Sequence, residues 1–107
     1  MSLQITGCTP TLRPSISHTI YRIVQESLSN ARRHGAAPRA DVTVDYNDER
    51  ARIVVRNPTM RTSRTDDRPT GLGLIGMRER VSLHRGHLET GPSSPGTWTV
   101  DATIPFA

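Results

Sequence analysis

The sequence contains no lysine, because all 14 of its basic residues are arginines, and it carries 10 acidic residues. Its one cysteine, Cys8, excludes an internal disulfide, and with four histidines it does not give the spacing of a zinc site. No apolar run approaches the roughly 18 residues of a membrane-spanning helix, and no secretion signal opens the chain. These absences favour a cytoplasmic protein and argue against disulfide-stabilised and membrane-spanning classes.

What is present is one domain, residues 1–107, with 34% hydrophobic residues and a net charge of +4. A basic chain suits nucleic acid, an anionic membrane surface or a phosphorylated small ligand. The arginines are spread from Arg13 to Arg85 without a dense block, and aromatic residues are only 4% of the chain. Nucleic acid is therefore the weaker interpretation, since it needs stacking platforms.

Hydrophobic periodicity predicts the element order β-α-β-β-loop-α-β-β. The predicted elements are a strand over 3–6, a helix from Pro14 that Gly35 stops, a hairpin with strands over 41–46 and 51–55, a polar loop over 57–70, a glycine-rich turn and helix over 71–86, and strands over 87–90 and 97–104 joined by a turn over 92–96. Two amphipathic helices and one half-buried sheet predict a two-layer α/β sandwich with the helices on one face of a mixed sheet.

Polar residues recur along one edge of the first predicted helix. Glu26, Asn30, Arg33 and His34 stand at i, i+4, i+7 and i+8, which places them where they can converge on one ligand. A carboxylate and an amide oxygen one turn apart suit a hydrated magnesium ion, and Arg33 suits a phosphate. An ordinary helix with polar flanks has the same spacing, so this pattern alone leaves both interpretations open.

Glycines recur at Gly71, Gly73 and Gly76, where the second helix begins. Glycine allows close approach of the backbone to a phosphate, and free N–H groups at a helix start attract anions. The segment lacks the preceding strand of the dinucleotide motif and the Lys-Ser/Thr of a P-loop, and helix-capping glycines are the alternative. Together with the first helix and the polar loop, it predicts a nucleotide pocket with a lid, the triphosphate lying between the two helices.

Two segments resemble named motifs of a known family. Residues 21–34 (YRIVQESLSNARRH) resemble the N box, and residues 71–81 (GLGLIGMRERV) the second glycine box, of the ATP-binding catalytic domain of bacterial sensor histidine kinases. That superfamily (GHKL, with the Bergerat ATP-binding fold) also holds gyrase and the Hsp90 chaperones. The short lid, about 58–70, is similar to the subfamily whose partners are helix-turn-helix response regulators.

The resemblance implies ATP and Mg²⁺ as cofactors and assigns roles to particular residues. Asn30 would coordinate Mg²⁺, Glu26 would act at the catalytic end of the site, and Arg33 would contact phosphate. Gly71, Gly73 and Gly76 would shape the lid hinge and the phosphate cradle. The implied nucleotide-binding set is Asn30, Arg33, His34, Asn57, Gly71, Leu72, Gly73, Leu74, Gly76 and Met77.

One motif departs from the family pattern. The family's first glycine box, Asp-x-Gly, falls on Asn57-Pro58-Thr59, so the acid that accepts a hydrogen bond from the adenine amino group is missing. Asn57 can still accept through its carbonyl oxygen, and it can also donate. The loss of a charge-assisted hydrogen bond costs about 1.5–3 kcal/mol, or roughly one to two decades of affinity.

The resemblance also implies partners that this chain does not contain. In such kinases the γ-phosphate passes to a histidine on a separate dimerisation hairpin, so we expect a C-terminal fragment of a longer, homodimeric kinase that serves a response regulator. We expect the fragment alone to bind ATP without autophosphorylation, in the cytoplasm or in the cytoplasmic part of a membrane-anchored sensor. The alternatives are a degenerate nucleotide-binding or interaction module, an anti-sigma-type serine kinase and, last, a nucleic-acid-binding protein.

Overall fold

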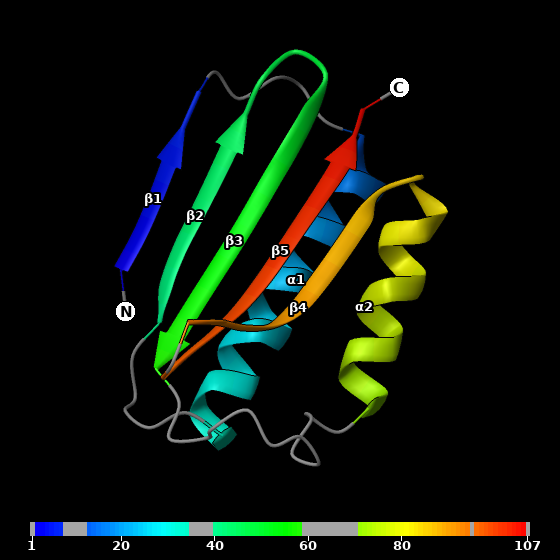
Figure 1. Ribbon diagram of the computed structural model, residues 1–107. Helices are drawn as coiled ribbons and strands as arrows, with labels where there is room; N and C mark the ends of the chain where they lie inside the picture. Colours follow the sequence, from blue (N-terminus) through cyan, green and yellow to red (C-terminus); the bar gives the residue numbers. More distant parts are fainter. Residues whose placement is uncertain (1, 8–12, 35–39, 59–70, 95, 107) are drawn as a thin grey trace.

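The computed structural model describes residues 2–7, 13–34, 40–58, 71–94 and 96–106, and within these ranges the chain forms a two-layer α/β sandwich. The elements are β1 (Ser2–Thr6), α1 (Pro14–His34), β2 (Asp41–Tyr46), β3 (Arg50–Pro58), α2 (Gly71–Leu83), β4 (His87–Ser94) and β5 (Thr97–Pro105). The strands form one sheet in the order β1-β2-β3-β5-β4, in which only β1 and β2 pair in parallel. Both helices cover the same face (Figure 1), which confirms the predicted fold class.

The face of α1 that packs on the sheet begins with three isoleucines, Ile16, Ile20 and Ile23, at the predicted spacings. Pro14 suits the first turn because its missing N–H has no partner there in any helix. Val24 and Leu28 are partly buried beside this face. Two polar residues, Thr19 and Ser27, are also buried on α1, and the apolar pattern did not single them out.

The core lies between the helices and the inner face of the sheet, where strand residues alternate in and out as the sequence predicts. Its buried apolar residues are Ile16, Ile20, Ile23, Ala40, Val42, Val44, Ala51, Ile53, Val55, Met77, Val81, Leu88, Val100, Ala102 and Ile104. Trp98, at the start of β5, packs against this cluster and is partly buried. The sheet thus presents one apolar face to α1 and α2 and one polar face to water.

The predicted boundaries at the end of β3, the end of β4 and the start of α2 were wrong, and each of these errors came from assigning glycine, proline or asparagine to a loop. β3 continues through Asn57 and Pro58 because β5 supplies a pairing partner for both residues. β4 continues through Pro92 to Ser94 with an irregular register, which an edge strand tolerates. The segment over 71–76 is already helical and is not a turn before the helix. The predicted lid began at about residue 58, but Pro58 belongs to β3; the rest of the predicted lid, 59–70, and the stop at Gly35 lie outside the described residues.

The second helix ends earlier than predicted, at Leu83. The chain then turns through Arg85, whose positive φ of 62° is unusual for a residue with a side chain. The N–H of Gly86 donates to the carbonyl of Val81 over 2.9 Å and closes the end of the helix. Gly86 therefore stands where the chain leaves α2 and enters β4.

A side-chain hydrogen bond joins α1 to the turn that follows α2. The Thr19 hydroxyl donates to the Ser15 carbonyl over 2.9 Å, so its oxygen accepts from Nε2 of His84, 3.2 Å away on the α2 side. This assignment places a proton on Nε2 of His84. Thr19 itself is 4% exposed, so the bond is shielded from water on the α1 side.

We expect Thr19→Val to lower the free energy of unfolding by about 1 kcal/mol, because it keeps the volume but removes both hydrogen bonds. Chemical denaturation of the variant and the parent protein measures the difference. Ser17→Ala, at an exposed position of the same helix, is the matched control and should change little. An unchanged midpoint for Thr19→Val would show that this contact does not stabilise the helix pair.

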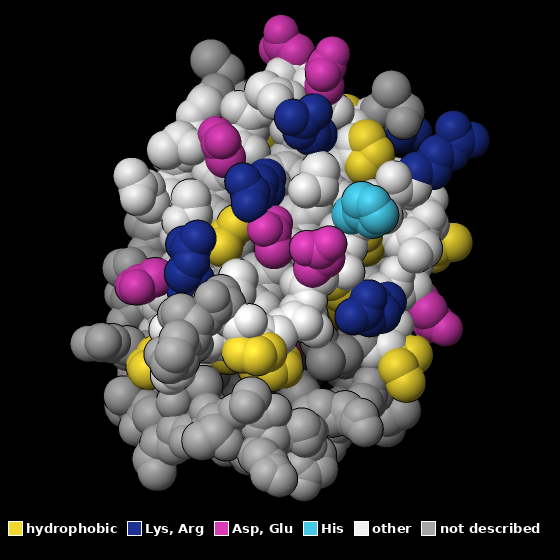
Figure 2. Space-filling view, in the orientation of Figure 1, with side chains coloured by type: hydrophobic (Ala, Val, Ile, Leu, Met, Phe, Trp, Pro, Cys, Tyr) yellow, Lys and Arg dark blue, Asp and Glu magenta, His cyan; other side chains and the backbone are white. Residues whose placement is uncertain are grey.

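The outer face of the sheet carries arginine and acidic side chains side by side (Figure 2). Arg52 on β3 holds Asp101 on β5 through two hydrogen bonds, Nε to Oδ1 at 3.1 Å and Nη2 to Oδ2 at 2.8 Å. The hydrogen bond from Arg52 to Asp101 and the charge of Asp101 raise the pKa of Arg52 above its ordinary value, so the guanidinium keeps its positive charge. Both side chains contact water, and such a pair adds little to stability.

Candidate functional site

The elements that carry the predicted site residues meet at one end of the molecule. The C-terminal half of α1, the end of β3, the start of β5 and the first turn of α2 all lie at the lower end in Figure 1. The β2–β3 turn lies at the opposite end. The fold therefore brings segments of α1, β3, β5 and α2, which are far apart in the sequence, to the same end of the molecule.

Helix α1 supplies the first group of predicted residues. Glu26 is half-buried, and it lies one helical turn before Asn30 on the same side of α1. Asn30, Arg33 and His34 belong to the last two turns of α1, and their side chains lie outside the described part of the structure. The helix backbone thus has the predicted spacing, while the roles of these four residues stay predictions.

Strand β3 supplies Asn57, which is 6% exposed and points toward the helices. Its Nδ2 donates a hydrogen bond to the carbonyl oxygen of Pro58 over 3.1 Å. That bond fixes the orientation of the amide, because the opposite orientation would set two oxygens against each other. The Oδ1 atom of Asn57 is therefore the atom left to accept a hydrogen bond, as a carboxylate would at this position.

Helix α2 supplies the third group. Because Gly71 already begins the helix, the N–H groups of its first turn lack partners within the helix and carry the positive end of its dipole. Met77 is 1% exposed and belongs to the core, so its side chain has a packing role. Gly76 is half-buried, and the side chains of Leu72 and Leu74 lie outside the described part.

Two polar atoms near this end are buried and have no hydrogen-bond partner among the described residues: Oγ of Ser27 and Nε1 of Trp98. Ser27 lies on α1, and Trp98 stands directly opposite Asn57 in the β3–β5 pair. The sequence reasoning missed both residues. The available signal for Ser27 was its position four residues after Ile23, a polar residue within an apolar stripe.

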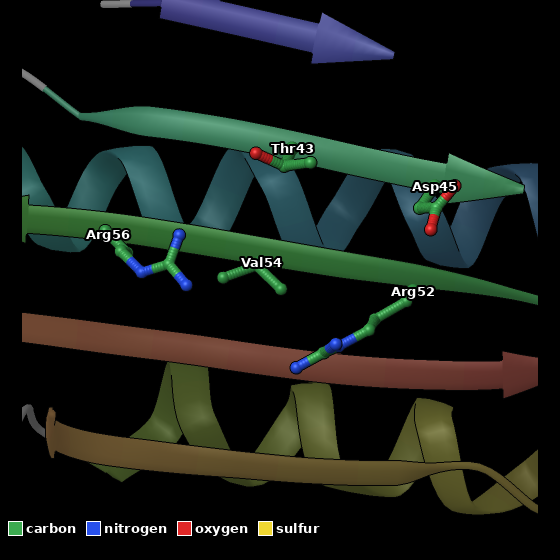
Figure 3. Close-up of a pocket in the computed structure, with 5 residues that line it drawn as sticks. All are labelled: Thr43, Asp45, Arg52, Val54 and Arg56. Carbon is green, nitrogen blue, oxygen red and sulfur yellow. The ribbon is translucent and has the colours of Figure 1, made fainter. Parts of the chain in front are cut away.

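A shallow depression of about 180 Å³ lies on the outer face of the sheet, away from this end of the helices. It is lined by Thr43, Asp45, Arg52, Val54 and Arg56 (Figure 3). Arg52 is already held by Asp101, and the depression mixes charges of both signs. It contains none of the predicted site residues and is separate from the candidate site.

Residues 16–107 match the model of a protein family described as histidine kinase-, DNA gyrase B- and HSP90-like ATPase. The chain belongs to this family. Within the histidine kinase-like ATPases it is 32% identical over 106 residues to the sensor histidine kinase MctS of Rhizobium johnstonii, which covers 96% of this chain and 23% of MctS. It is 28% identical over 87 residues to the histidine-protein kinase/phosphatase DegS of Brevibacillus brevis, which covers 81% of this chain and 22% of DegS.

Solved structures of histidine kinases have the same fold as this ATPase domain. The histidine kinase domain of the Erythrobacter litoralis EL346 blue-light-activated kinase gives a TM-score of 0.72 at 19% identity, over 98% of this chain and 54% of that one. Full-length ShkA, solved in complex with AMPPNP, gives 0.76 at 18% identity, over 99% of this chain and 25% of that one. The sequence relatives and the fold confirm the predicted resemblance to the ATP-binding domain of sensor histidine kinases.

The ATPase domain spans 22–23% of the length of the two curated relatives. Neither helix in the described ranges is long and apolar enough to cross a membrane.

Proposed function

We propose that this domain binds Mg-ATP and donates its γ-phosphate to a histidine on a separate dimerisation domain of a sensor kinase. The observation that carries the proposal is that the C-terminal half of α1, the end of β3 and the first turn of α2 lie at the same end of the fold (Figure 1). Among the structural neighbours, ShkA holds AMPPNP. The base would lie near Asn57, and the phosphates would lie between the two helices.

The donor groups on α1 fit a magnesium ion by their chemistry. Mg²⁺ prefers oxygen ligands, keeps several waters and takes few ligands from the protein, and Glu26 and Asn30 offer a carboxylate and an amide oxygen one turn apart. Asn30 would hold the ion, and Glu26 would act on it or on the attacking group at the catalytic end. When bound, the ion supplies neutralisation of the phosphate charge.

The remaining residues position the phosphates. The N–H groups of the first turn of α2 point toward the site end, and Gly71 and Gly73 have no Cβ to keep a phosphate away. Arg33, and with it His34, would contact phosphate from the last turn of α1. The work of the domain is thus to position and neutralise, which is how phosphoryl transfer is generally catalysed.

In this proposal the acceptor histidine and the homodimeric contacts belong to the parent kinase, and the response regulator is its partner. We place the domain in the cytoplasm, either in a kinase that is free there or in the cytoplasmic part of a membrane-anchored sensor kinase. The isolated domain binds ATP but does not complete the transfer by itself. A transfer assay with a separately supplied dimerisation domain would distinguish it from an anti-sigma-type kinase, which phosphorylates a serine of its partner.

The binding of ATP is tested with Asn30→Ala. We expect the parent domain to bind ATP with a dissociation constant in the micromolar to millimolar range and to bind it more weakly when EDTA removes Mg²⁺. Asn30→Ala should bind ATP several-fold more weakly and lose this dependence on the metal, as measured by isothermal titration calorimetry. Ser17→Ala, exposed on the same helix, is the control and should behave as the parent. Equal affinity and metal dependence in Asn30→Ala would remove Asn30 from the site.

A second candidate is a nucleotide-binding module that has lost turnover. Asn57 favours it, because the carboxylate expected of the family is missing at a position that the structure buries. Such a module would bind ATP with the Mg²⁺ dependence described above yet transfer no phosphate to the dimerisation domain. The transfer assay therefore separates the two candidates.

A further inference from the structure

We propose that Ser27 and Trp98 determine base specificity and, with Asn57, recognise the polar edge of adenine. The inference rests on the proposed function and assigns two residues that are not in the nucleotide-binding set implied by the family resemblance. Three observations carry it. The Ser27 hydroxyl and the Trp98 indole N–H are buried without a hydrogen-bond partner among the described residues. The Asn57 amide has its Oδ1 left as an acceptor, because its Nδ2 donates to the Pro58 carbonyl.

Ser27 is 2% exposed, and its Oγ finds no partner in the part of the chain that the structure describes. Many serines in helices donate to the carbonyl four residues earlier, as Thr19 does to Ser15 on this same helix. Ser27 does not, so its hydroxyl is unused. An unpaired buried hydroxyl costs stability, and an alanine would fill the same space without that cost. A ligand that forms a hydrogen bond with this hydroxyl would explain why position 27 is a serine and not an alanine.

Trp98 carries the second unused group. Its Nε1–H can only donate, and it is buried without an acceptor in the described structure. Trp98 stands opposite Asn57 on the neighbouring strand, and both residues are on the face of the sheet that the helices cover. The indole donor therefore belongs to the strand position that is paired with Asn57, on the same face of the sheet.

Ser27 is placed at the same end of the fold. It is the buried residue of α1 closest to the C-terminal end of that helix among the described side chains. That half of α1, the end of β3 and the start of β5 lie together at the lower end in Figure 1. Helix α1 packs on β3, so the helix that carries Ser27 lies over the strand that carries Asn57.

The three groups match one base. Asn57 presents an acceptor, because its Nδ2 is held by the Pro58 carbonyl, and Ser27 and Trp98 each present a donor. The edge of adenine offers the complementary order, since its 6-amino donor lies between the ring acceptors N1 and N7. Guanine and hypoxanthine carry an oxygen at that central position, which would face Oδ1 of Asn57. The hydrogen bonds can be direct or pass through a water.

The test uses Ser27→Ala and Trp98→Phe with ATP, ITP and inorganic tripolyphosphate, each with Mg²⁺. Each variant should bind ATP about five-fold more weakly, as the loss of one hydrogen bond predicts, and should bind tripolyphosphate as the parent does. The preference for ATP over ITP should fall in both. Ser27→Ala should also melt at the same or a higher temperature, since it removes an unpaired buried group, whereas a merely structural serine would leave the ATP/ITP ratio unmoved. Ser17→Ala is the control.

The inference is overturned if Ser27→Ala lowers the melting temperature and leaves ATP affinity unchanged, because the serine is then structural. It is equally overturned if the parent binds ATP and tripolyphosphate with the same affinity, because the base is then not recognised, while the proposed function stands. A parent domain that binds no ATP would overturn the proposed function itself and the inference with it.

Discussion

Asn57→Asp is expected to tighten the binding of adenine nucleotides by about five- to ten-fold. A hydrogen bond from the 6-amino group contributes about 1.5–3 kcal/mol with a carboxylate acceptor and about 0.5–1.5 kcal/mol with a neutral amide, so the gain is about 1–1.5 kcal/mol. The structure leaves Oδ1 of Asn57 as the accepting atom, so the substitution changes the charge of that acceptor and keeps its place. Titration of both proteins with ATP and Mg²⁺ measures the change.

The same substitution should lower the stability of the nucleotide-free domain. Position 57 is 6% exposed, and an aspartate there loses the hydrogen bond to Pro58 and turns an oxygen toward that carbonyl. Asn47→Asp is the matched control, because Asn47 lies exposed in the β2–β3 turn at the other end of the molecule, where its oxygen already accepts from Glu49 and Arg50. Unchanged ATP affinity in Asn57→Asp would mean that position 57 does not contact the base.

Gly86→Ala is expected to destabilise the domain by about 3 kcal/mol, which lowers the melting temperature by about 10 °C or more in a domain of this size. A Cβ at position 86 would collide with the backbone carbonyl of Thr103 on β5, and it would stand 2.8 Å from Cγ1 of Val81. Neither atom can move alone, because Thr103 is in the sheet and Val81 is 1% exposed in the core. Thermal unfolding followed by circular dichroism measures the shift.

Gly76→Ala is the matched control for that experiment and should have the opposite sign. Gly76 lies inside α2, and a Cβ there would meet only Nη1 of Arg80, at the ordinary contact distance of 3.5 Å. Replacing a glycine by alanine within a helix adds about 0.5–1 kcal/mol of stability. If both variants lost stability equally, the close approach of Gly86 to β5 would not be the cause.

The sequence was sufficient to predict the layers of this fold because burial is periodic in it. Ile16, Ile20 and Ile23 repeat with the helical period, and Ala51, Ile53 and Val55 repeat with the period of a strand. In each case the predicted residues are the buried ones. Such a pattern does not depend on where the loop boundaries are drawn. It therefore predicted the element order and the single face of the sheet that the helices cover.

The boundaries near the site were harder to predict, because local preference and long-range pairing disagree there. The local preferences of Asn57 and Pro58 favour a loop, but β5 pairs with both residues and so extends β3. Gly71 and Gly73 read as a turn, yet they begin α2. Sequence motifs placed the candidate site residues on α1, β3 and α2, and the side-chain roles of Glu26, Asn30 and Arg33 stay predictions.

The partners of individual polar atoms were beyond sequence reasoning. The orientation of the Asn57 amide depends on a carbonyl of the next residue, and the unused Oγ of Ser27 depends on what the helix layer leaves open to it. The orientation of that amide and the lack of a partner for that hydroxyl cannot be deduced from the residue type alone. In our proposal these atoms decide which base the site accepts, so base specificity is the part of the proposed function that required coordinates.

The interrupted register of β4 has a consequence for self-association. β4 is one of the two margins of the sheet, and it carries Pro92, which has no N–H to offer, beside a shift in pairing before Ser94. An incoming strand would find no continuous row of donors and acceptors along this margin. Strand exchange or fibril growth is therefore obstructed on that flank, and the opposite margin, the short β1, is where any lateral addition of a strand would begin.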